Sequence, residues 1–418
     1  MKTNLFKSAV LATSLVMALT ACSDKKSNNN DTNKNIHADA QMSSEDLTDA
    51  GEQLVSPYTF MLADKIMDMA VQKDPSNTKA QFYHIFLERM MVFKGIAKRI
   101  HPLVKQGSAQ QQQDYDKWIK TFPESPMKKF LLDGPEDIQT YSQLQNVLAN
   151  YQQALNDFRK FLKANQAMQL TLNLNPHVFE KEINEEMANS CVYVEGPDHQ
   201  YDVQCDMSGI AQKKINAADI VALRQIVGGE MLYYAMLNSY DLSTIEQVTR
   251  ANQNKQLTPQ QTLDMYKALP SVAKLRKDQM LSLVPELGAD FSAAAKWAIQ
   301  YQSSICPKGN GPIGNQRPGF LFKNGLCVDN ISDTQKSLAI LDQVLSGIYT
   351  APIKDDQGNT TDQIRVNLIG FLMNPPKDLK TVMPDAVDQD GHVTRFSDNT
   401  ISGLFPDGDV QKLNKQKN

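Results

Sequence analysis

The residues that could most clearly do chemistry are four cysteines beyond residue 190: Cys191, Cys205, Cys306 and Cys327. Four thiols can hold a metal ion, but the chain has no Cys-x-x-Cys and no histidine close enough to complete a zinc-binding spacing. No cysteine–histidine pair indicates a thiol nucleophile either. Because an even number of cysteines is typical of disulfide-bonded exported proteins, we predict two disulfides, for which three connectivities exist.

The sequence around the first two cysteines favours one pairing. Cys191–Glu195 and Tyr201–Cys205 are typical of two strands joined by the loop 196–200. An antiparallel register that pairs the strand ends nearest the loop places Cys191 opposite Cys205. At a non-hydrogen-bonded pair the two Cα atoms lie about 4.5 Å apart, which is within disulfide reach.

The remaining two cysteines would form the second bridge. Residues 320–328 place Asn324-Gly325 between two apolar runs, which predicts a β-hairpin with a two-residue turn. Cys306 follows a predicted helix, so a bond to Cys327 would join the hairpin to that helix. Each closure is expected to stabilise the fold by on the order of 3 kcal/mol.

Other motifs that could bind a nucleotide or a metal are better explained as loops or turns. Residues 309–314 spell G-x-G-x-x-G, but they follow a helix and lack the strand–turn–helix context of a nucleotide site. Residues 388–391 resemble half of a calcium loop whose first and last carboxylates are absent, so we expect a turn between short strands at 386–387 and 393–396. The six histidines are scattered. We therefore predict no catalytic residue, no metal site, no cofactor and no enzymatic activity.

The composition is that of an ordinary globular protein. The chain has 418 residues, of which 41% are hydrophobic and 22% charged, with a formal net charge of −4. These values exclude collagen-like, fully disordered and polytopic membrane proteins. Since no basic field is present, we expect no nucleic-acid partner.

The N-terminus has the pattern of an export signal. Lys2 and Lys7 precede an uncharged run from 8 to 21, whose 14 residues are too few to span a bilayer. The run ends in Leu-Thr-Ala-Cys, which resembles the lipobox of bacterial lipoproteins. That resemblance implies that the signal 1–21 is removed, and that Cys22 becomes the N-terminus and carries acyl chains such as palmitate. A plain signal peptide with an incidental Cys22 is the alternative.

The same resemblance implies a location. Ser23 stands where an aspartate would favour retention at the inner membrane, so we expect the protein on the periplasmic side of the outer membrane. Several acyl chains make a stable anchor, and the membrane is therefore contacted through lipid and not through a basic patch. Residues 22–46 are polar, and we expect a lipidated flexible tether there.

Beyond the tether the periodicity is mainly helical. We divide this part into a helical repeat-like region at 47–190, a helical region with the two disulfide-braced hairpins at 191–350, and short strands with a C-terminal tail at 351–418. A heptad seam over 137–166 predicts a helix that packs against another helix of this chain, with an intermolecular coiled coil as the alternative. The segment 217–239 is apolar nearly all round, which predicts a central buried helix.

Further elements are expected along the chain. Helices are predicted at 259–269, 289–304 and 333–349, the first with Thr258 as its cap. The segment 363–372 begins with strand-like alternation, and we expect it to join one of the disulfide hairpins in a small sheet.

One stretch resembles a known repeat. Small and apolar residues occur at tetratricopeptide spacing at Leu47, Ala50, Gly51, Leu54, Ala63, Met67, Ala70 and Pro75. The resemblance covers about 34 residues without a second clean copy, whereas a stable solenoid usually needs three or more repeats. It implies a closely packed helix pair, and a plain αα-hairpin is the alternative. More loosely, the chain resembles uncharacterised bacterial lipoproteins, which implies no function.

Five methionines gather around the repeat-like stretch: Met61, Met67, Met69, Met90 and Met91. Methionine commonly fills gaps in a core, but such a cluster can also form an adaptable groove. A groove requires that Met61 and Met69 be accessible to solvent.

These features predict a mainly α-helical, tetratricopeptide-like protein with a small disulfide-braced β element. Its expected function is that of a non-enzymatic scaffold or adaptor that presents a helical surface to an envelope protein. The alternative is a binding module for a small or lipidic ligand in a Met-rich helical pocket. An enzyme with a site assembled from distant residues is a third class that the sequence leaves open.

Overall fold

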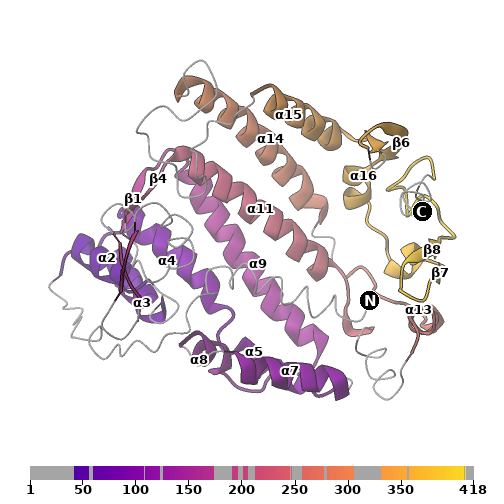
Figure 1. Cartoon of the computed structure of the whole chain (residues 1–418), viewed down its shortest axis with the longest axis horizontal. Helices are drawn as coiled ribbons and strands as arrows, with labels where there is room; N and C mark the ends of the chain where they lie inside the picture. Colours follow the sequence, from indigo (N-terminus) through magenta and orange to yellow (C-terminus); the bar gives the residue numbers. More distant parts are fainter. Residues whose placement is uncertain are drawn as a thin grey trace.

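The computed structural model is mainly helical, with 61% helix and 10% strand, which confirms the predicted mainly α class. The helices lie side by side, and the strands form small antiparallel pairs (Figure 1). The structure describes residues 42–55, 60–107, 109–122, 126–173, 191–195, 201–205, 212–244, 246, 257–276, 280–305, 331–354, 357–408 and 410.

The described chain begins with three helices, α2 (Ser44–Gln53), α3 (Phe60–Lys73) and α4 (Thr78–Met91). Ser43 and Asp46 form a capping box that starts α2. The predicted boundary of the tether at residue 46 is therefore wrong, because residues 44–46 belong to α2. A Cβ on Gly51 would lie 2.9 Å from Cε of Met67, which shows how closely α2 and α3 approach. The DP-x-N turn ends with Asn77, whose side chain caps α4.

Four short helices follow and lie together along one side of the molecule (Figure 1): α5 (Ile96–Arg99), α6 (His101–Val104), α7 (Ala109–Thr121) and α8 (Pro126–Leu132). Phe130 of α8 is buried and its ring packs edge-on against Phe60 of α3, with 4.6 Å between centroids. This contact joins α8 to the first three helices.

The long helices α9 (Tyr141–Ala164) and α11 (Ala217–Ser239) are antiparallel neighbours. Gln145 near the start of α9 donates to the carbonyl oxygen of Tyr240 just beyond α11, at 2.6 Å. At the other end, Arg224 donates to Gln166 at 2.7 Å. The predicted packing of the heptad seam against another helix of the same chain is therefore confirmed.

The array continues with α14 (Met280–Ile305) and α15 (Ile331–Ser346), while α13 (Pro259–Ala268) lies apart from it (Figure 1). The helix at 259–269 is confirmed, and Thr258 forms the expected cap in a capping box. Helix α14 starts nine residues before the predicted 289, since the helix continues through Pro285. The predicted helix at 333–349 corresponds to α15.

Four two-stranded antiparallel sheets complete the described structure. They pair β1 (Leu170–Asn173) with β4 (Gln212–Ile215), β2 (Cys191–Glu195) with β3 (Tyr201–Cys205), β5 (Tyr349–Lys354) with β6 (Thr360–Val366), and β7 (Ala386–Val387) with β8 (Val393–Arg395). The predicted turn between two short strands near residue 390 is thus confirmed.

The expectation for the segment 363–372 is wrong in part. Its first residues belong to β6, but among the described strands β6 pairs with β5 and not with the cysteine-bearing β2–β3 hairpin. The chain then enters the short helix α16 (Leu368–Met373), because the side chain of Asn367 accepts from the backbone N–H of Gly370 and caps it. A 3₁₀ helix, η3 (Leu379–Val382), follows.

The backbone register around the first cysteine pair is the predicted one. Cys191 lies opposite Cys205 across the β2–β3 ladder. The described residues do not support the disulfide bracing itself, which stays a prediction. Cys22, Cys306, Cys327 and the predicted hairpin at 320–328 lie outside the described residues.

Candidate functional site

The five methionines do not line one groove. Met67 and Met90 are buried in the main core, which also contains residues of α2, α4, α8, α9 and α11. Met61, Met69 and Met91 are half-buried and pack against the outside of this core. Met67 and Met90 therefore fill the core. Met61 and Met69 are partly accessible to solvent, and such access is what a groove requires.

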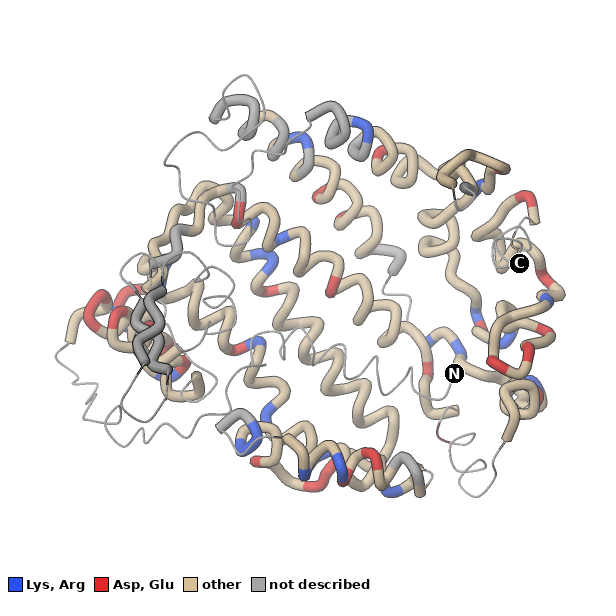
Figure 2. Tube along the Cα trace, viewed as in Figure 1, with Lys and Arg blue, Asp and Glu red and all other residues tan. Residues whose placement is uncertain are grey.

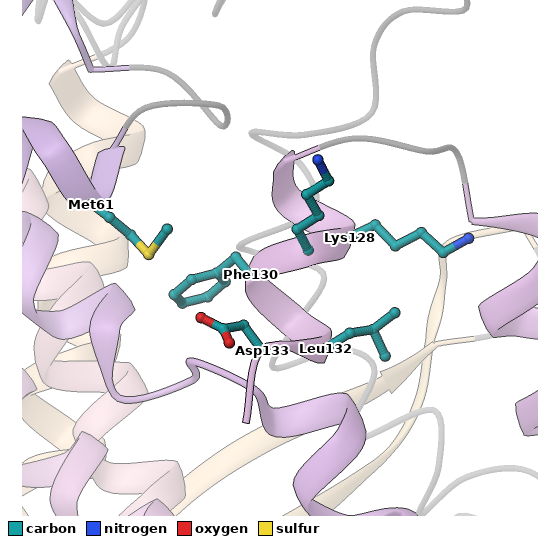
Figure 3. Close-up of a pocket in the computed structure, with 6 residues that line it drawn as sticks. Met61, Lys128, Phe130, Leu132 and Asp133 are labelled. Carbon is teal, nitrogen blue, oxygen red and sulfur yellow. The ribbon is translucent and has the colours of Figure 1, made fainter. Parts of the chain in front are cut away.

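One hollow of about 560 Å³ includes one of these methionines, Met61. Met61 of α3 and Phe130 of α8 point toward one another across it, and Lys128, Leu132 and Asp133 also contribute to its wall (Figure 3). The hollow thus combines apolar surface with charged groups of both signs.

A buried carboxylate joins the first helices to β1. Glu52 of α2 has no exposed surface, yet its two oxygens accept four hydrogen bonds. Tyr83 Oη donates at 2.6 Å and the backbone N–H of Asn173 at 2.7 Å to Oε1, while Lys79 Nζ at 2.6 Å and Asn173 Nδ2 at 3.1 Å donate to Oε2. Burial, together with the Glu52 charge, raises the pKa of Tyr83 far above its usual value. The carboxylate is satisfied by structural partners.

A second charged cluster joins α9, α11 and α14. Asp290 of α14 is buried, with Arg159 Nη1 of α9 at 3.3 Å and Arg224 Nε of α11 at 3.1 Å from its Oδ2 atom. Both arginines are almost completely buried. Arg159 also donates to Glu286, whose side chain is half-exposed. Burial lowers the pKa of Arg224, and the Asp290 charge opposes that effect. The geometry is that of an interhelical clamp.

A third group lies where α4, α9 and α11 meet. Arg89 of α4 stacks over the rings of Phe86 and Phe158, and its Nη1 atom lies 3.9 Å from Oε2 of Glu230. Tyr151 donates to the other oxygen of Glu230 at 2.6 Å. In contrast, the buried Tyr234 hydroxyl finds no hydrogen-bond partner among the described residues.

These two tyrosines allow a matched test. We expect Tyr151→Phe to destabilise the protein by about 1–3 kcal/mol, because it removes a donor to the part-buried Glu230 carboxylate. Tyr234→Phe should be neutral or stabilising by up to about 1 kcal/mol, because it removes a hydroxyl that is buried without a partner. Urea denaturation followed by circular dichroism measures both. Equal losses in the two variants would contradict the difference in hydrogen bonding.

The predicted turn near residue 390 contains the one potential metal-binding group found among the described residues: Asp388, Asp390 and His392. All three are exposed. The Asp388 carboxylate accepts from the backbone N–H groups of Asp390 and His392, and these bonds, the one from His392 first, lower its pKa. They close the turn between β7 and β8, which explains the arrangement without a metal.

The outer face of α11 is the feature that the sequence missed. Ile226, Tyr233 and Met236 are 48%, 37% and 40% exposed, so the helix is not buried all round as predicted. Gly229 lies between them on the same face and is also exposed. We call these four residues the α11 stripe. Figure 2 shows how few charged residues α11 carries, and none belongs to the stripe.

Local patterning could not have found this stripe, because α11 is apolar nearly all round. Two faces of α11 pack against α9 and α14, whereas no described residue covers its third face. The charged clusters could be suspected only weakly from the sequence, because Arg159 and Arg224 are charged residues on otherwise apolar helix faces. Their acidic partners lie far away in sequence, which hides the pairing.

The chain matches no protein-family model, no curated protein and no solved structure. Among the helices of the described chain, none combines the length and apolar character that crossing a bilayer requires.

Proposed function

We propose that the protein is a lipid-anchored, non-enzymatic scaffold of the bacterial envelope. In this proposal, acyl chains on Cys22 hold it to the outer membrane, and its helical array presents a surface to an envelope protein. The observation that carries the scaffold role is the α11 stripe. Large apolar side chains on a helix face that no described residue covers, in the middle of an array, are typical of protein-binding surfaces.

The arrangement of the first helices supports the tetratricopeptide-like part of the proposal. Helix α2 packs closely on α3 at Gly51, and α4 follows after the DP-x-N turn. Successive antiparallel helices with small residues at the contacts are the building principle of helical repeats. We further propose that Cys191 and Cys205 form a disulfide in the oxidising periplasm, a bond for which the β2–β3 register is suitable.

Affinity purification tests the scaffold and its anchor together. The full-length protein would be cross-linked in envelopes, solubilised in detergent and purified beside a Cys22→Ala variant, which cannot be lipidated. We expect one dominant envelope protein with the normal chain and several-fold less of it with the variant, because the variant is no longer concentrated at the membrane. The absence of a reproducible partner in both samples would overturn the scaffold.

The hollow at Met61 favours a second candidate, a binding module for a small amphipathic ligand. Met61 offers apolar contact, and the exposed Lys129 in the same wall offers a cation for an anionic head group. Native mass spectrometry of the purified protein distinguishes this candidate, since a retained ligand would add a defined mass that Met61→Ala removes. A ligand-free spectrum would speak against it.

A further inference from the structure

The two adjacent glycines of α11 have different surroundings. A Cβ on Gly228 would lie 3.4 Å from Leu287 and 3.5 Å from Phe291, so this glycine faces α14. A Cβ on Gly229 would have no atom within 4 Å. Glycine lowers helix stability. Packing against α14 compensates for that effect at Gly228, but no contact within the described chain compensates for it at Gly229.

The shape of the α11 stripe suits a narrow partner. The stripe extends from residue 226 to 236, which is about 15 Å or three turns of helix. Stable contacts between globular proteins bury about 800 Å² on each side, far more than three side chains on one helix can provide. A second copy of the whole chain would therefore be held poorly by this surface, whereas a single helix would fit along it.

The composition of the stripe defines the chemistry of that helix. Ile226, Tyr233 and Met236 offer apolar contact with one phenolic hydroxyl, and no charge lies among them. Gly229 forms a notch between Ile226 and Tyr233, where another backbone can come close. Such notches are the usual contact points of closely crossing helices.

From this geometry we infer that the α11 stripe binds one uncharged, apolar face of a single partner helix, which lies along the stripe and comes closest to α11 at Gly229. The inference rests on the proposed scaffold function and specifies its docking surface. It does not depend on the lipid anchor, because the stripe and the tether are separate parts of the chain.

Gly229→Ala separates binding from folding. Because the added methyl group meets no atom of the described chain and alanine favours helix, the variant should melt at the same temperature as the normal protein or higher. The same methyl group fills the notch, so recovery of the partner helix should fall about tenfold. A merely structural role for Gly229 would move stability and recovery in the same direction.

Site-specific photo-cross-linking locates the surface. A benzophenone amino acid would replace Ile226 or Met236 in the full-length, membrane-attached protein, and Ile340 on α15, which is 43% exposed, is the matched control. We expect adducts from positions 226 and 236 on one helical segment of one protein, separated there by about ten residues. Position 340 should not give that adduct, and Gly229→Ala should suppress it.

The outcomes distinguish the surface from the function. A partner recovered in the purification but cross-linked equally from position 340, or at scattered sites, would overturn the α11 surface and leave the scaffold intact. Adducts with a second copy of this chain or with lipid would overturn the single-helix partner. Loss of any reproducible partner would instead overturn the scaffold function itself.

Discussion

Replacing Asp290 with alanine is expected to destabilise the protein by about 3–5 kcal/mol, the usual effect of removing one partner from a buried ion cluster. Asp290 Oδ2 lies 3.3 Å from Arg159 Nη1 and 3.1 Å from Arg224 Nε. Without that carboxylate, two buried guanidinium groups on neighbouring helices would repel one another. The midpoint of urea denaturation, measured by circular dichroism, reports the change.

Asp342→Ala is a suitable control for this experiment. Asp342 of α15 also lies beside α14, with Lys296 at 3.5 Å, but 44% of its side chain is exposed. Its removal should cost less than about 1 kcal/mol, because water screens exposed pairs. Replacing Arg159, Arg224 and Asp290 together by apolar residues should recover much of the loss, since the burial of charge disappears with the cluster. Equal effects of the two single substitutions would refute the clamp.

Glu52→Ala is expected to have a comparable effect of about 3–5 kcal/mol. Glu52 of α2 is the common acceptor for donors from α4 and β1, and its loss leaves the buried Tyr83 hydroxyl and the backbone N–H of Asn173 without their acceptor. The side chain of Lys79 is part-exposed and can turn to solvent, which limits its share of the cost. Thermal unfolding, together with amide exchange at β1, measures the loss.

The neighbouring acid on α2 provides the comparison. Asp49 lies 3.8 Å from the same Lys79, but 73% of its side chain is exposed. We expect Asp49→Ala to change stability by less than about 1 kcal/mol. If the two alanine variants unfolded at the same temperature, the hydrogen bonds to Glu52 would not be the cause.

Much of the secondary structure was predictable because its signals are local. Thr258 and Pro259 mark the start of α13, and the heptad seam marks α9, since caps and helix periodicity depend on residues three or four positions apart. The β2–β3 register followed from a short loop in the same way. The segment after residue 366 was misassigned because the cap at Asn367 starts a helix within a strand-like pattern.

The candidate site was less predictable for a physical reason. Asp290 is 131 residues from Arg159, and Asn173 is 121 residues from Glu52, so no local spacing announces either cluster. The five methionines between residues 61 and 91 were likewise divided between the core and its outer edge, because neighbouring positions on a helix face different directions.

The sequence by itself determined where several of the longer helices lie, which positions of the β2–β3 hairpin face one another, and that the protein is mainly helical. Those properties depend on hydrogen bonds and side-chain contacts between near neighbours in the chain. Only the tertiary structure decided which charges share a buried carboxylate and which face of α11 is left uncovered by the described residues. Burial depends on the distant segments that cover a residue, and an apolar helix carries the same sequence whether its third face is covered or exposed.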